Sequence, residues 1–68
     1  MRIVLNGEPR DLRDRATVAE AVDASGASDS HDGVAVAVDG EVVPRSRWAD
    51  QELGEGEHVE VLQAVQGG

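Results

Sequence analysis

Apolar and polar residues alternate in short runs along the chain, and turn-forming residues separate the runs. The stretch 2–6 alternates imperfectly, which predicts a β-strand. Asn6-Gly7 follows it and is a strong hairpin signal, to which Pro9 adds turn character. We therefore expect a short return strand over residues 10–12.

A helix is predicted next. Thr17 and Glu20 have the spacing of a capping box, in which each side chain bonds to the backbone N–H of the other residue. The apolar residues that follow fall at helical spacing, which predicts a helix over residues 18–25. Gly26 is suited to end it in the left-handed conformation. So short a helix would not persist alone in water, so we expect it to pack against a sheet.

The second half of the chain predicts three further strands. Residues 34–38 are all apolar, which favours a central strand buried on both faces. Asp39-Gly40 is the second hairpin dipeptide, and residues 41–43 form the return strand. Residues 58–65 are the last strand, which we expect to pair beside the first.

Between these strands, residues 45–53 predict irregular chain or one short helical turn. Trp48 is the only aromatic residue of the protein. We expect it to cover the core next to Pro44, and a contact with a partner is the alternative interpretation. In the last strand Leu62 breaks the alternation of Val59 and Val61, which indicates a partly exposed apolar face. Such a face would suit the docking of a partner.

The order of elements defines the fold class: an α+β domain with a small mixed sheet and one packed helix. We assign residues 1–65 to this domain and residues 66–68 to a flexible tail. The sequence shows no internal repeat and no linker.

The composition and net charge disfavour some classes of function. The chain has 68 residues, no cysteine, 14 acidic residues and 6 basic ones, for a net charge of −8. Nucleic acid is disfavoured because phosphate binding needs a basic patch. The sequence predicts neither a signal peptide nor a membrane span, so we expect a cytoplasmic protein without a membrane partner. The acidity favours solubility, and steering toward a basic partner is the alternative.

Metal binding is weakly supported. His31 lies between Asp29 and Asp32, but their spacing matches no known metal motif, and a solvated loop explains them better. His58 is a second histidine beside acidic residues, and no partner for a catalytic role is evident. We expect no metal site.

The tail carries the clearest chemical signal. Gly67 and Gly68 have no side chains, so they can enter a tunnel too narrow for other residues. Residues 66–68 can reach roughly 10 Å beyond the sheet, at about 3.3–3.6 Å per residue. Two terminal glycines arise by chance in about one chain in 200. The tail can thus deliver the Gly68 carboxylate at a distance.

With these elements in place, the chain resembles the ubiquitin-like β-grasp sulfur carriers, most closely the thiamine-biosynthesis carrier family ThiS. The resemblance spans nearly the whole chain, and its specific parts are a Val-Pro-Arg-x-x-Trp stretch and the Gly-Gly end. The matching segments are residues 1–7, 17–20, 34–38 and 42–49, and the last strand, residues 58–65, running into Gly67-Gly68. Gln66 departs from the pattern, since such carriers often have a small residue there.

The resemblance implies a carrier that is a co-substrate and not an enzyme. An adenylating, E1-like (ThiF-type) enzyme would use Mg-ATP to activate the Gly68 carboxylate, and a sulfur donor protein would convert it to a thiocarboxylate for thiazole synthase. The carrier itself would bind no cofactor and would be a monomer when free. Gln66, Gly67 and Trp48 are the expected partner-binding residues.

Three other functions remain open at this point. The first is sulfur delivery to molybdopterin or another product. The second is a protein modifier that is joined to lysines through Gly68, as ubiquitin is. The third is a β-grasp interaction module whose terminal glycines are incidental. Loss of Gly68 would abolish the first two and leave the third intact.

Overall fold

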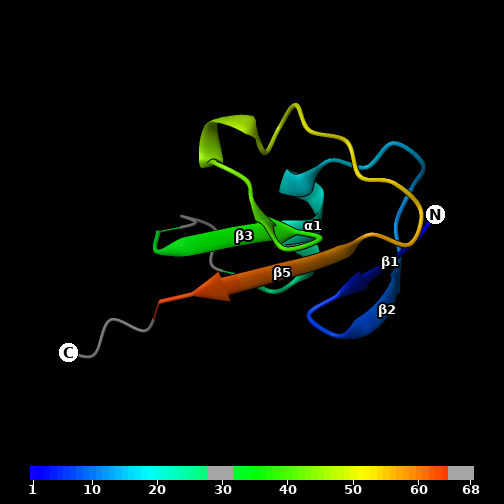
Figure 1. Cartoon of the computed structure of the whole chain (residues 1–68), viewed down its shortest axis with the longest axis horizontal. Coiled ribbons are helices and arrows are strands. Elements are labelled where there is room, and N and C mark those ends of the chain that lie inside the picture. The colour runs from blue at the N-terminus through cyan, green and yellow to red at the C-terminus, as the bar shows by residue number, and fades with distance from the viewer. Residues whose placement is uncertain (28–31, 65–68) are drawn as a thin grey trace.

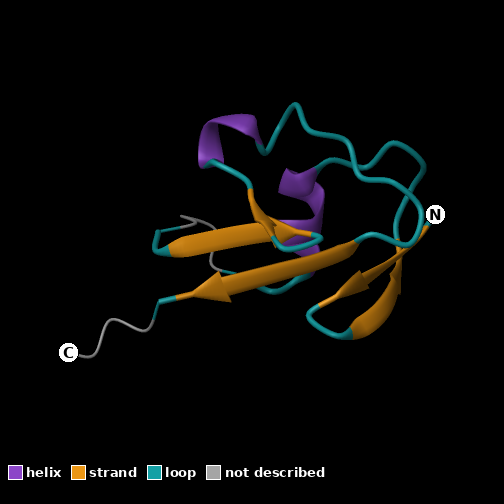
Figure 2. Cartoon of the chain, viewed as in Figure 1, coloured by secondary structure: helices purple, strands orange, loops and turns teal. Residues whose placement is uncertain are grey.

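A five-stranded sheet with a helix across one face forms the structure (Figures 1 and 2). The computed structural model describes residues 1–27 and 32–64. Within these ranges the elements are β1 (Arg2–Leu5), β2 (Glu8–Asp11), α1 (Val18–Ala24), β3 (Val34–Val38), β4 (Glu41–Val42), the 3-10 helix η1 (Arg45–Arg47) and β5 (His58–Gln63). The strand order is β2-β1-β5-β3-β4. Over the same ranges, no helix is both long and apolar enough to cross a membrane.

The sheet is mixed because β5 pairs in opposite senses with its two neighbours. It runs parallel to β1 and antiparallel to β3. The prediction that the last strand lies beside the first is confirmed, and β5 (orange in Figure 1) is the middle strand of the sheet. β5 ends at Gln63, two residues before the predicted end, and Val65 lies outside the described residues.

The first hairpin forms where the Asn6-Gly7 dipeptide predicted it. Both residues have positive φ, +50° and +83°, as the tight turn between two strands requires. The return strand starts earlier than predicted, at Glu8, so Pro9 lies within β2 and not in the turn. β2 is an edge strand, where a proline is tolerated.

The nitrogen of Pro9 faces away from β1. Met1 and Leu12 exchange both backbone hydrogen bonds, at 2.9 and 2.8 Å. Hydrogen-bonded and non-bonded pairs alternate along an antiparallel ladder. Pro9 lies opposite Val4, three pairs from Met1 and Leu12, so this pair is non-bonded. The missing N–H therefore costs the sheet no hydrogen bond.

The predicted capping box is confirmed at the start of α1. The Glu20 backbone N–H donates to Thr17 Oγ1 at 3.4 Å, and the Thr17 N–H donates to Glu20 Oε2 at 2.8 Å. The helix ends at Ala24, one residue earlier than predicted, and Gly26 follows with a φ of +85°. The cap and the left-handed glycine thus set both ends of the helix.

Glu20 has a second partner that sets its charge. The Arg13 guanidinium donates to both carboxylate oxygens, at 2.6 and 2.7 Å. These bonds, and next the bond from the Thr17 N–H, lower the pKa of Glu20 from its ordinary 4.5 to about 2.

The stability difference between the protein and a Glu20→Gln variant should therefore depend on pH. Folding lowers this pKa, so the charge stabilises the fold above about pH 4.5, and that contribution disappears as the pH falls toward 2. Glutamine still accepts from the Thr17 N–H, so the variant keeps the cap and removes the charge together with the acceptor for Arg13 Nε. Urea midpoints of both proteins should converge toward pH 2, and a pH-independent difference would contradict this explanation.

The core lies between α1 and one face of the sheet. The helix contributes Val18, Ala21 and Val22, and the irregular segment before β5 adds Trp48 and Leu53. The sheet and its β4 extension contribute the other buried side chains, Ile3, Leu5, Val36, Val38, Val43, Val59 and Val61.

The prediction that residues 34–38 are buried on both faces is wrong. Val36 and Val38 point into the core, whereas Ala35 is exposed and Ala37 is only half-buried. The described chain has one α-helix, and it covers one face of the sheet. The alanines of β3 therefore lie on the open face of the sheet. The continuous apolar run had predicted a second layer of structure that covers this face.

Candidate functional site

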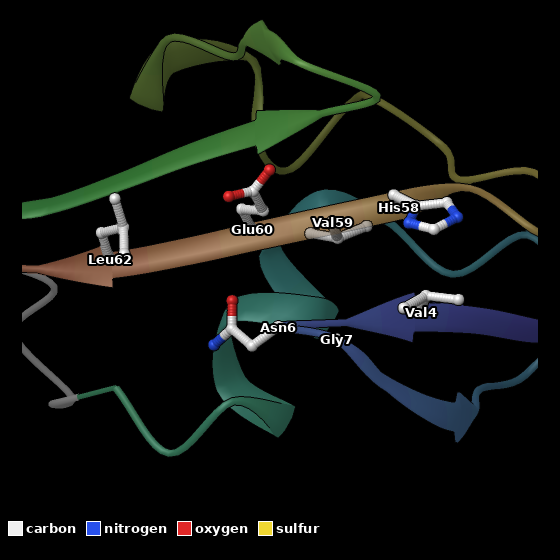
Figure 3. Close-up of a pocket in the computed structure, with 7 residues that line it drawn as sticks. All are labelled: Val4, Asn6, Gly7, His58, Val59, Glu60 and Leu62. Carbon is white, nitrogen blue, oxygen red and sulfur yellow. The ribbon is translucent and has the colours of Figure 1, made fainter.

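The open face of the sheet is apolar around β5. Val42 and Leu62 are 72% and 66% exposed, the largest exposures among the big apolar side chains described. Two shallow depressions, of about 440 and 120 Å³, adjoin each other here, and both are lined in part by Glu60 and Leu62. The first, drawn in Figure 3, extends to Val4 on β1. The second extends to β3 and β4.

Leu62 lines both depressions of this surface, which we call the open-face patch and define as Val4, Ala35, Ala37, Val42 and Leu62. The prediction of a partly exposed apolar face on the last strand is confirmed, because Val59 and Val61 are buried and the apolar Leu62 lies at an exposed position. Glu60 and His58 lie on the same strand and are exposed. The patch is thus apolar and is bordered by Glu60, which lines both depressions, and by His58, which lines the first.

The end of β5 is held from both sides. On the β3 side, the Ala64 N–H donates to Gly33 O at 2.9 Å, one residue beyond the strand, and Gln63 Nε2 donates to Asp32 O at 3.3 Å. Gly33 has a φ of +71°, and a Cβ there would lie 3.3 Å from the Ala64 Cβ. A glycine therefore suits this close crossing.

On the β1 side, a side chain holds β5. Asn6 Oδ1 accepts from the Val61 N–H at 2.8 Å, and Asn6 Nδ2 donates to Val61 O at 3.2 Å. Figure 3 shows this carboxamide turned toward β5. The sequence gives no sign of this contact, because the Asn-Gly turn alone accounts for an asparagine here. The two bonded residues are 55 positions apart, and no local pattern reports such a pair.

The predicted site residues of the tail, Gln66, Gly67 and Gly68, lie outside the described residues. Ala64 makes the last described hydrogen bond of the ladder, and four residues follow it. At full extension these four residues place the C-terminus at most about 13–14 Å from Ala64. The reach is measured from a strand end that is fixed on both sides.

Trp48 lies in the core, as its main interpretation predicted. It is 4% exposed, and its Nε1–H donates to Val43 O at 3.0 Å. The Arg45 guanidinium carbon lies 5.9 Å from the centroid of the indole ring, within the range of a cation–π contact. Its predicted contact with a partner stays untested, and only a small part of the indole is accessible.

The histidines are not brought together. His31 and Asp29 lie outside the described residues, and His58 is exposed on β5. Among residues 1–27 and 32–64, no group of three or more histidine, cysteine, aspartate or glutamate side chains is arranged to hold a metal ion.

Comparisons with known proteins agree with one another. The family model of the ThiS family matches residues 3–68. The chain is similar to the crystal structure of a thiamine biosynthesis protein (ThiS) from Geobacter metallireducens, with a TM-score of 0.75, 27% identity and full coverage of both chains. A solution structure of a thiamine biosynthesis protein from the same organism has a TM-score of 0.76 and 27% identity, covering 100% of this chain and 88% of that one. No curated protein sequence matches the chain. The expected ubiquitin-like β-grasp fold is confirmed by these likenesses.

Proposed function

The chain belongs to the ThiS family, and on that premise we propose that it carries sulfur for thiamine biosynthesis as a thiocarboxylate on Gly68. The observation that supports this most directly is the family match, which continues through the Gly67-Gly68 end of the chain. The protein is then a co-substrate, whose terminal carboxylate is the reacting group. We place it in the cytoplasm as a free monomer.

The chemistry needs an activated carboxyl group. A carboxylate is a poor electrophile, so the partner enzyme transfers AMP from Mg-ATP onto the Gly68 carboxylate and releases pyrophosphate. The terminal sulfur of a persulfide on a donor protein then attacks the carbonyl carbon and AMP leaves, which joins Gly68 to the donor cysteine through an acyl disulfide. A thiol cleaves the S–S bond, forms a disulfide with the donor cysteine and releases the thiocarboxylate. The resulting thiocarboxylate is a soft nucleophile for thiazole synthase. The Mg-ATP is bound by the activating enzyme, and the carrier supplies the tail and a docking surface.

The open-face patch is the docking surface we propose for the adenylating enzyme. It is apolar, it is exposed, and it includes Leu62 near the end of β5, the strand from which the tail departs. Apolar side chains at the centre of an interface exclude water and supply much of the binding energy. The net charge of −8 supports a basic rim on the partner, which would speed association.

A Leu62→Glu variant should weaken docking without damaging the fold. Leu62 is 66% exposed, so the free energy of unfolding should change by no more than about 0.5 kcal/mol. A buried charge at the interface should raise the KM for the carrier at least about 10-fold, with little change in kcat. Ser46→Glu adds the same charge on η1 and serves as the control. Equal KM values for both variants would exclude the patch as the docking surface.

The direct test of the function is the intact mass of the protein after incubation with its adenylating enzyme, Mg-ATP and a sulfur source. We expect an oxygen-to-sulfur mass increase that maps to Gly68 and requires ATP. If an enzyme that is active on another carrier produces neither the adenylate nor the increase, the proposal is wrong. Isopeptide-linked products in a cell extract would instead indicate a protein modifier.

A further inference from the structure

Hydrogen bonding along the β1 side of β5 continues beyond the last backbone bond from β1, because a side chain takes over. The last backbone bond of this ladder on β1 is from the Asn6 N–H to Val59 O, at 2.9 Å. The chain then turns away at Asn6-Gly7. Both polar backbone groups of Val61, the next residue of β5 that faces β1, bond instead to the Asn6 side chain, at 2.8 and 3.2 Å.

The carboxamide of Asn6 replaces the two backbone groups that a continued parallel strand would offer to Val61. In a continued parallel ladder, the Val61 N–H would donate to the backbone carbonyl of residue 6, and Val61 O would accept from the N–H two residues further on. The side-chain oxygen and nitrogen of Asn6 take these two roles. An asparagine is suited to this task because its amide carries the same donor and acceptor as the backbone.

The other hairpin makes a related bond at the opposite end of β5. Asp39 is the first residue of the Asp39-Gly40 turn and has a φ of +49°, close to the +50° of Asn6. Its Oδ1 accepts from the His58 N–H at 2.9 Å. Two equivalent turn residues therefore hold the two ends of the same strand, and only Asn6 acts at the end from which the tail departs.

We propose that Asn6 is a positioning residue for activation of the C-terminus, an inference that rests on the proposed carrier function. By holding Val61, it fixes the direction in which the chain leaves the sheet relative to the open-face patch. Four residues follow Ala64, with a maximum reach of about 13–14 Å, so a shift of this strand end by about an ångström shifts the point from which the carboxylate must reach its place in the enzyme. Displacement on that scale can cost about 100-fold in rate.

The test compares Asn6→Gly with Asp39→Gly. Glycine accepts the positive φ of both positions, so each variant keeps its turn and loses only the side-chain bonds to β5. The kinetic probe is ATP–pyrophosphate exchange by the adenylating enzyme at varied carrier concentration. We expect kcat to fall about 10-fold or more for Asn6→Gly, with KM nearly unchanged, and to stay within about 2-fold for Asp39→Gly.

Amide hydrogen exchange supplies an independent readout. Exchange at the Val61 amide, which donates to Asn6 Oδ1, should accelerate in Asn6→Gly and keep its wild-type rate in Asp39→Gly. If Asn6→Gly does not fold, Asn6→Asp replaces it, because aspartate keeps the acceptor for the Val61 N–H and sets a carboxylate oxygen against Val61 O. We expect the same loss of kcat from it.

The outcomes separate the inference from the function on which it rests. If the wild-type protein supports no exchange, the carrier function fails, and the role of Asn6 fails with it. If the wild type is active and Asn6→Gly (or Asn6→Asp) has the kcat of Asp39→Gly, the positioning role alone is wrong. A rise in KM with unchanged kcat would also overturn it, because that pattern indicates lost docking.

Discussion

Deletion of Gly68 should abolish sulfur loading while leaving the fold unchanged. The shortened chain still ends in a glycine carboxylate, but that group stops about 3.3–3.6 Å short of its place. Such a displacement should lower the rate of adenylation at least about 100-fold. The core residues all lie between positions 3 and 61, so the unfolding midpoint should not move. Intact mass after incubation with enzyme, Mg-ATP and sulfur source measures the loss.

The control for this deletion is Gly68→Ala, which keeps the length and the carboxylate and adds only a Cβ atom. A loss in both variants would show that the site accepts glycine alone at this position. A loss in the deletion only would show that the length of the tail is what matters. Full loading of the deletion variant would contradict the proposed role of Gly68.

Trp48→Ala should be the most destabilising single change in the domain. Removing a buried tryptophan typically costs about 3–5 kcal/mol, and a chain of this size has about 3–10 kcal/mol in total. The variant should therefore be partly or wholly unfolded at 25 °C. Urea unfolding must be followed by far-UV circular dichroism, because Trp48 is the only aromatic residue and the variant has no fluorophore.

Trp48→Phe separates packing from hydrogen bonding at this site. Phenylalanine retains most of the buried ring but cannot donate to Val43 O, so its cost should be about 1–3 kcal/mol. If Trp48→Ala cost less than Trp48→Phe, the indole would not be a core residue. A folded Trp48→Phe protein with a raised KM for adenylation would support the untested partner contact.

The sequence predicted the helix well because its signals are local. Thr17 and Glu20 are three residues apart, and each bonds to the other's backbone as the capping box requires. Gly26 follows the helix with the expected positive φ. The hairpins were found for the same reason, since Asn6-Gly7 and Asp39-Gly40 each prescribe a turn without help from distant residues.

Tertiary features were predicted less well. The apolar run of β3 indicated burial on both faces, but a short run of valines and alanines does not show how many layers cover the sheet. The tail was recognised from Gly67 and Gly68 because their chemistry lies in the sequence itself. The role of Asn6 was missed because its partner, Val61, lies 55 residues away and bonds through backbone atoms that every residue has.

Both edges of the sheet are poor templates for a further strand. The outer side of β2 presents the nitrogen of Pro9, which has no hydrogen to donate, and β4 is only two residues long. These two edges therefore disfavour strand pairing between copies of the protein, even at high protein concentration. A partner that binds the proposed docking surface would therefore contact the side chains of the open face and not a backbone edge, so point substitutions in the open-face patch should be enough to change which partner binds.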